Sequence, residues 1–130
     1  MDDVRVEIDG KMLIITVSGY RDNFAQVVEG SRRIVELARD HGCHSIIADY
    51  NNVTFNLNLS EAFNLIRLYE HSLPDFKDYH LAAVINEQSK EIAGFWESIG
   101  KKRNFNIKTF GTVRAAREWL MAIAHNTPTR

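Results

Sequence analysis

Apolar and polar residues alternate over residues 4–8, which is the period of a β-strand with one buried face. Residues 12–17 (MLIITV) are almost wholly apolar, so we expect a second, mostly buried strand there. Between the two lies Asp9-Gly10, a pair of residues typical of a two-residue hairpin turn. The chain is therefore predicted to open with an antiparallel hairpin, and we expect Gly19 to close it.

The remainder of the chain alternates between helical and strand patterns. Apolar spacing predicts helices over residues 24–39, 60–71, 88–102 and 112–124, and short apolar runs predict strands over 45–50, 79–85 and 106–110. Asp22 or Asn23 can cap the first helix, Gly42 occupies the usual stop position, and Thr112 can cap the last helix. This order predicts an α/β fold, with a mixed, mostly parallel sheet, the hairpin strand at its edge, and about four helices packed on the sheet.

Length and composition are those of one globular domain. The chain has 130 residues, of which 45% are hydrophobic and 25% charged, enough for a core without metal or disulfide staples. We expect the domain to cover residues 1–125 and residues 126–130 to form a frayed tail. The formal net charge of −1 provides no basic surface, so no nucleic-acid partner is expected.

The sequence carries no signal for export or membrane insertion. Cys43 is the sole cysteine, so no internal disulfide can form, and a reducing compartment is expected. The acidic start Met1-Asp2-Asp3 lacks the basic-then-apolar plan of a signal peptide. No apolar run approaches the roughly 18 residues of a membrane span. We therefore expect a cytoplasmic protein.

Three stretches carry a resemblance to a known family. They are the hairpin ending in Ser18-Gly19, the run DYNNVTF over residues 49–55, and the region 80–120 with its segments LAAVI, FNIKTF and AAREWL. Together they resemble the STAS family, which includes sulfate-transporter tails and anti-sigma factor antagonists. The likeness is greatest to its SpoIIAA-like branch, also labelled STAS/SEC14-like. The resemblance implies a SpoIIAA-like STAS domain with a regulatory, non-enzymatic function in a bacterial system.

The same resemblance implies the kind of partner. A protein partner is expected, such as an anti-sigma-like factor or a regulatory kinase, and no cofactor is implied. The SEC14-like label implies an alternative function, the binding of a small apolar ligand or lipid, which would need a pocket of about 300 Å³ or more. A two-fold homodimer is a further candidate assembly.

Ser60 is the candidate phosphoacceptor. Anti-sigma factor antagonists carry a phosphorylatable serine at the start of a helix, in an Asp-Ser-Ser-Gly-like run, whereas residues 56–61 here read NLNLSE. Only Ser60 matches, so the resemblance implies a degenerate phosphoserine switch. Helix N-termini favour added negative charge, which suits a phosphoserine. Serine is also an ordinary N-cap, and we favour the cap.

The segment from Asp49 to Ser60 is the predicted contact surface for a partner or ligand. It follows a predicted parallel strand, and open α/β sheets place ligands beyond the carboxyl ends of such strands. Its asparagines could line a polar pocket or could serve only as turn residues. The candidate residues are Asp49, Asn51, Asn52, Phe55, Asn56, Asn58 and Ser60.

No catalytic or metal site is predicted. Asp49 is a lone carboxylate that we expect to accept backbone N–H bonds, because His80 should lie at the opposite end of the neighbouring strand. An enzyme using Asp49 as an acid or base is therefore the weakest of three hypotheses. His41, Cys43 and His44 lie together but lack a second ligand pair at metal-binding spacing.

The helix over residues 60–71 has more apolar residues than a one-sided helix needs. Leu65 and Leu68 accompany Ala62, Phe63, Ile66 and Tyr69. Either the helix is flanked by neighbours on both sides, or the surplus surface binds a partner, a lipid or a second copy of the chain. Phe55, Leu57 and Leu59, just before this helix, could likewise pack on the sheet end or contact a ligand. The leading hypothesis is a STAS-type binding module that uses the 49–60 segment and this helix.

Overall fold

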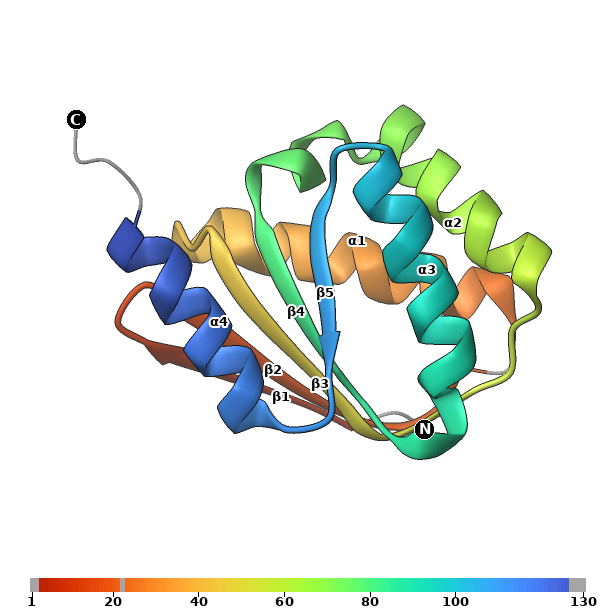
Figure 1. The fold of residues 1–130 in the computed structure, drawn as a ribbon, viewed down its shortest axis with the longest axis horizontal. Helices are drawn as coiled ribbons and strands as arrows, with labels where there is room; N and C mark the ends of the chain where they lie inside the picture. Colours follow the sequence, from red (N-terminus) through yellow and green to blue (C-terminus); the bar gives the residue numbers. More distant parts are fainter. Residues whose placement is uncertain (1–2, 22, 127–130) are drawn as a thin grey trace.

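The computed structural model describes residues 3–21 and 23–126 (Figure 1). One five-stranded sheet has the order β1-β2-β3-β4-β5, with β1 antiparallel to β2 and the other neighbours parallel. The strands are β1 Asp3–Asp9, β2 Met12–Arg21, β3 Ser45–Phe55, β4 His80–Ile85 and β5 Asn106–Phe110. The helices are α1 Phe24–His41, α2 Leu59–Ser72, α3 Lys90–Lys102 and α4 Val113–Asn126, with short 3-10 turns η1 Pro74–Asp78 and η2 Glu87–Ser89. The predicted mixed α/β sheet with an edge hairpin is confirmed.

The sheet separates two layers of helices (Figure 1). Helices α1, α2 and α3 cover one face, where Leu13 and Ile15 of β2 belong to the larger apolar cluster. Helix α4 covers the other face, where Ile14 belongs to a smaller cluster that includes Ala116 and Leu120. Because successive side chains of a strand point to opposite faces, the almost wholly apolar run 12–17 supplies both layers.

The predicted caps of the first and last helices are confirmed. Asn23 accepts a hydrogen bond from the backbone N–H of Gln26 at 2.9 Å, whereas the alternative cap, Asp22, lies outside the described residues. Gly42 ends α1 with a φ of 64°, the left-handed conformation that favours glycine. Thr112 Oγ1 accepts from the N–H of Ala115 at 3.1 Å.

The hairpin differs from the prediction at both of its ends. Asp9 pairs with Met12, so the turn residues are Gly10 and Lys11 rather than Asp9 and Gly10. Gly10 has a φ of 63°, which a side chain would make unfavourable. The prediction that Gly19 closes the hairpin is wrong: β2 continues past it to Arg21, because β3 is long enough to pair with this extension.

The C-terminal elements show smaller differences. Residues 87–89 form the turn η2, so α3 begins at Lys90 rather than Gln88. Phe95 has the same helical spacing as Ile92, Trp96 and Ile99, which would predict a buried position, yet it is exposed, because α3 turns Ala93 and Gly100 towards the core. The last helix reaches Asn126, and the rest of the predicted tail lies outside the described residues.

Two glycines of α3 provide a matched test of this packing. A Cβ atom on buried Gly100 would clash with Cδ1 of Ile107, whereas a Cβ on exposed Gly94 would meet nothing within 4 Å. Gly100→Ala should therefore lower the free energy of unfolding by about 1–3 kcal/mol through overpacking. Gly94→Ala should raise it by about 0.5–1 kcal/mol, because alanine favours the helix. Chemical denaturation measures both; equal effects would contradict the close contact between α3 and β5.

Candidate functional site

Most of the predicted 49–60 loop is a β-strand. β3 was expected to end at Tyr50 but runs to Phe55, and its extension pairs with residues 18–21 of β2. Only Asn56, Leu57 and Asn58 connect it to α2. The expectation of a long asparagine-rich loop is therefore wrong, because the partner strand overrides the poor strand preference of asparagine.

A β-bulge lies where the predicted loop begins. Between neighbouring pairs, β2 advances from Thr16 to Ser18 while β3 advances from Asp49 to Asn52, so β3 carries one extra residue. A bulge leaves backbone groups outside the ladder, and Asp49 Oδ1 accepts a hydrogen bond from the N–H of Asn51 at 3.0 Å. The expected capping function of Asp49 is confirmed, at a bulge instead of a loop.

Asn86 holds the same region from the neighbouring strand. β4 ends at Ile85, which pairs with Tyr50, so the rest of β3 has no β4 partner. The Asn86 side-chain amide donates to the carbonyls of Asn51 and Val53 at 3.0 and 3.1 Å. Asn86 was not predicted as a site residue, although it directly follows the predicted strand 79–85, at the carboxyl end where open α/β sheets place their ligands.

Asn58, not Ser60, caps α2. Asn58 Oδ1 accepts from the N–H of Glu61 at 2.8 Å, and the Glu61 carboxylate accepts from the N–H of Asn58 at 3.1 Å, forming a capping box. The prediction that Ser60 is the cap is wrong, because the helix begins at Leu59 and Ser60 already lies in its first turn. Ser60 and Asn56 are both exposed.

The asparagines do not line a common pocket. Asn58 is engaged in the cap, and Asn51, Asn52 and Asn56 are exposed. His80 pairs with Ser45 and lies at the opposite end of the sheet from Asp49. Within residues 3–21 and 23–126, no group of three or more His, Cys, Asp or Glu side chains could hold a metal ion.

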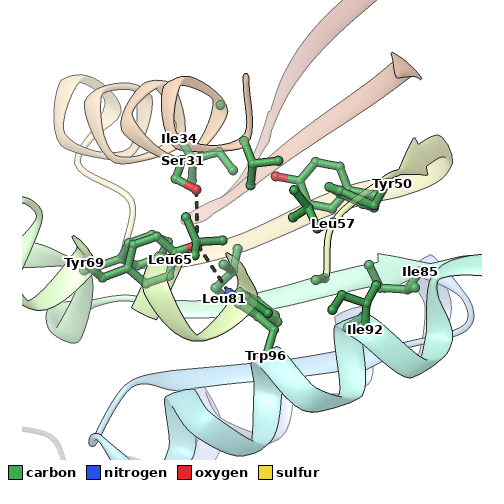
Figure 2. Close-up of a pocket in the computed structure, with 17 residues that line it drawn as sticks. Ser31, Ile34, Tyr50, Leu57, Leu65, Tyr69, Leu81, Ile85, Ile92 and Trp96 are labelled. Carbon is green, nitrogen blue, oxygen red and sulfur yellow. Dashed lines mark hydrogen bonds between the residues drawn. The ribbon is translucent and has the colours of Figure 1, made fainter. Parts of the chain in front are cut away.

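A cavity of about 70 Å³ lies between the sheet and helices α1, α2 and α3 (Figure 2). Phe55 and Leu57, from the end of β3 and the connector, lie at its half-buried end together with Tyr50. The deeper end is formed by buried side chains of the helices and of β4. The lining residues are Val27, Gly30, Ser31, Ile34, Tyr50, Phe55, Leu57, Ala62, Leu65, Tyr69, Phe76, Leu81, Ala83, Ile85, Ile92, Ala93 and Trp96. This volume is below the expected 300 Å³ of a lipid pocket.

Three polar groups meet at the deep end of this cavity. Tyr69 Oη lies 3.1 Å from Ser31 Oγ and accepts a hydrogen bond from Trp96 Nε1 at 3.3 Å (Figure 2). Burial raises the pKa of Tyr69 to about 12, against the smaller opposite effect of these two hydrogen bonds. We call this the Ser31–Tyr69–Trp96 chain; it joins α1, α2 and α3, and residue spacing in the sequence contains no signal for it.

The surplus apolar residues of α2 are explained mainly by flanking neighbours. Leu65 and Tyr69 are buried against the cavity, and Leu68 packs against the same cluster. Phe63 lies beneath the guanidinium of Arg103, 5.4 Å from its ring centre. Leu59 is the exception, with 50% of its surface exposed at the start of the helix.

The assignment of the cap can be tested by a pair of alanine substitutions. Asn58→Ala removes one side of the capping box and should lower the free energy of unfolding by about 0.5–2 kcal/mol. Ser60→Ala, two residues away and exposed, should change it by less than about 0.5 kcal/mol. Urea denaturation of both variants distinguishes the two caps: a larger loss for Ser60→Ala would restore Ser60 as the cap.

Comparison with known proteins identifies the fold. No protein-family model matches the sequence, and no curated protein sequence is significantly similar to it. Among solved structures, an anti-sigma factor antagonist from Mycobacterium paratuberculosis is similar, with a TM-score of 0.63, 12% identity, and coverage of 93% of this chain and 95% of that chain. The anti-sigma factor antagonist SpoIIAA in its unphosphorylated form is also similar, with a TM-score of 0.55, 17% identity and coverage of 93% and 98%.

Two conclusions follow from these comparisons and from the described helices. No helix within residues 3–21 and 23–126 has the length and apolar character to cross a membrane. At these identities the likeness concerns the fold, and the element order, sheet topology and helix layers agree with it. The chain has the STAS fold of the anti-sigma factor antagonists.

Proposed function

We propose that this protein is a non-enzymatic regulatory module that binds a protein partner through the 49–60 segment and the start of α2. The similarity to two anti-sigma factor antagonists supports a partner of the anti-sigma-factor or regulatory-kinase type. The carboxylate of Asp49 and the amide of Asn86 bond the backbone of Asn51 and Val53, which fixes the first part of the segment at the carboxyl edge of the sheet. Rigid elements lower the entropy cost of binding.

The exposed side chain of Leu59 is the observation that carries this proposal. Half of its surface is accessible, and Asn56 and Ser60 beside it are also exposed. Since the capping box of Asn58 and Glu61 already stabilises the helix start, neither Leu59 nor Ser60 is needed for that purpose. An apolar residue surrounded by polar neighbours is a common centre of a protein interface.

Ser60 is the candidate point of regulation within this surface. A phosphate there would add about 1.5 to 2 negative charges at a helix N-terminus, where backbone N–H groups favour them. Glu61, however, already places a carboxylate in that turn. This carboxylate, which accepts the N–H of Asn58, would be repelled by the added negative charge. We therefore propose that the phosphoserine switch of the anti-sigma factor antagonists is degenerate here.

The partner surface can be tested by two matched substitutions. Leu59→Glu places a charge at the centre of the proposed surface, and Met121→Glu places one on α4, where Met121 is 58% exposed. Each variant is used as bait in native lysate, with quantitative mass spectrometry of the proteins recovered. We expect a specific partner to bind the wild type and Met121→Glu alike, and Leu59→Glu at least about tenfold more weakly, the effect of a hot-spot loss.

Two results of this experiment would count against the proposal. Equal recovery by Leu59→Glu would remove the 49–60 surface as the binding site. A wild-type protein that recovers no partner at any salt concentration would contradict a protein-binding function altogether.

A small apolar ligand is the second candidate function, supported by the cavity beneath Phe55 and Leu57. At about 70 Å³ the cavity suits a compact molecule better than a lipid chain. Native mass spectrometry and organic extraction of the purified protein test for a co-purifying molecule. Self-association through Leu59 is a related proposal, which light scattering can test.

A further inference from the structure

The Ser31–Tyr69–Trp96 chain has one more hydrogen than it can use internally. Its members carry three polar hydrogens: the indole N–H of Trp96 and the hydroxyl hydrogens of Tyr69 and Ser31. Two hydrogen bonds join the chain, from Trp96 to Tyr69 and between Tyr69 and Ser31. Whichever hydroxyl donates in the second bond, the hydrogen of the other is left over. Among the described residues, Ser31 Oγ and Tyr69 Oη form no further hydrogen bond besides these two.

The left-over hydrogen belongs to a group that lines the cavity. Ser31 and Tyr69 are both buried, with 6% and 2% of their surface exposed, and both contribute to the cavity wall (Figure 2). The rest of the wall is mostly apolar. A water molecule buried in a protein makes about three hydrogen bonds, so a wall whose other polar side-chain groups belong to Tyr50 and Trp96 is a poor water site. An acceptor atom carried on an apolar body matches this wall better.

The wall also determines the charge of the guest. None of the described side chains that line the cavity is charged. A carboxylate buried there would lose its hydration without gaining a cation, which is strongly unfavourable. The raised pKa of Tyr69, caused mainly by burial, shows that the same environment opposes negative charge.

We infer that the cavity binds a small, uncharged organic molecule with a compact apolar body and one acceptor oxygen, such as a ketone, ester or ether. The oxygen accepts the left-over hydrogen of the Ser31–Tyr69 pair, and the body lies beneath Leu57. An apolar cavity of about 150 Å³ holds benzene, so a cavity of about 70 Å³ limits the guest to a molecule no bulkier than benzene. The inference rests on the proposed apolar-ligand function and names its ligand class.

The protein has two tryptophans, Trp96 and Trp119, and the difference between their positions makes a direct test possible. Trp96 belongs to the hydrogen-bonded chain, whereas Trp119 packs against Phe110 and His80 on the other face of the sheet. Both indole N–H resonances of the ¹⁵N-labelled full chain are followed by NMR, with Trp119→Phe used for assignment. The probes are 2-butanone, 2-methyl-1-butene (the same shape without the oxygen), butanoate, and xenon under pressure.

We expect 2-butanone to shift the Trp96 resonance, leave Trp119 unchanged and bind about fivefold more tightly than 2-methyl-1-butene, the effect of one net hydrogen bond. Ser31→Ala removes one hydroxyl hydrogen but also the partner of Tyr69, whose hydroxyl hydrogen is then left over, so this preference should persist. Ser98→Ala, an exposed site on α3, should retain it. Butanoate should not bind.

The remaining outcomes distinguish a failure of the proposed ligand class from a failure of the apolar-ligand function itself. If xenon and 2-methyl-1-butene shift Trp96 but 2-butanone binds no better, the cavity accepts apolar guests and the inference about the acceptor oxygen is overturned. Tighter binding of butanoate would also overturn it. If no probe, xenon included, shifts Trp96, the apolar-ligand function fails and the inference fails with it.

Discussion

The hydroxyl group of Tyr69 is the point at which the helical layer is joined. This buried oxygen on α2 is hydrogen-bonded to Ser31 of α1 and Trp96 of α3, so a single atom connects all three helices on that face of the sheet. The ring of Tyr69 packs against Phe76 and Phe105, with centroid distances of 4.5 and 5.7 Å. A buried polar group without partners is costly, so the oxygen requires all three helices to remain in position.

The cavity and the partner surface both depend on this arrangement. The helices that meet at Tyr69 enclose the cavity, and Phe55 and Leu57 cover its half-buried end. The same short connector leads into the capped start of α2, where Leu59 is exposed. The two proposed functions therefore share one structural element. A guest beneath Leu57 and a partner on Leu59 would each act on the connector between β3 and α2.

Local sequence patterns predicted the elements well because most of their causes are local. Apolar periodicity located every helix and strand, and the caps at Asn23, Gly42 and Thr112 follow from residue chemistry. The extension of β3 could not be predicted in this way, because its asparagines join the sheet only through pairing with residues 18–21 of β2. The cap of α2 was within reach, since Asn58 and Glu61 have the spacing of a capping box and Ser60 lacks an acidic residue three positions later. The cavity was not, because residues 31, 69 and 96 meet only through tertiary structure.

The central claim, that the Tyr69 oxygen joins the three helices, is tested most directly by the free energy of unfolding of a variant that lacks this atom. Tyr69→Phe retains the ring and its packing but leaves the Trp96 indole N–H and the Ser31 hydroxyl without their partner. We predict that the free energy of unfolding falls by about 1–3 kcal/mol, the cost of leaving a buried polar group unpaired. A Tyr69→Phe variant as stable as the wild type, or more stable, would contradict the account.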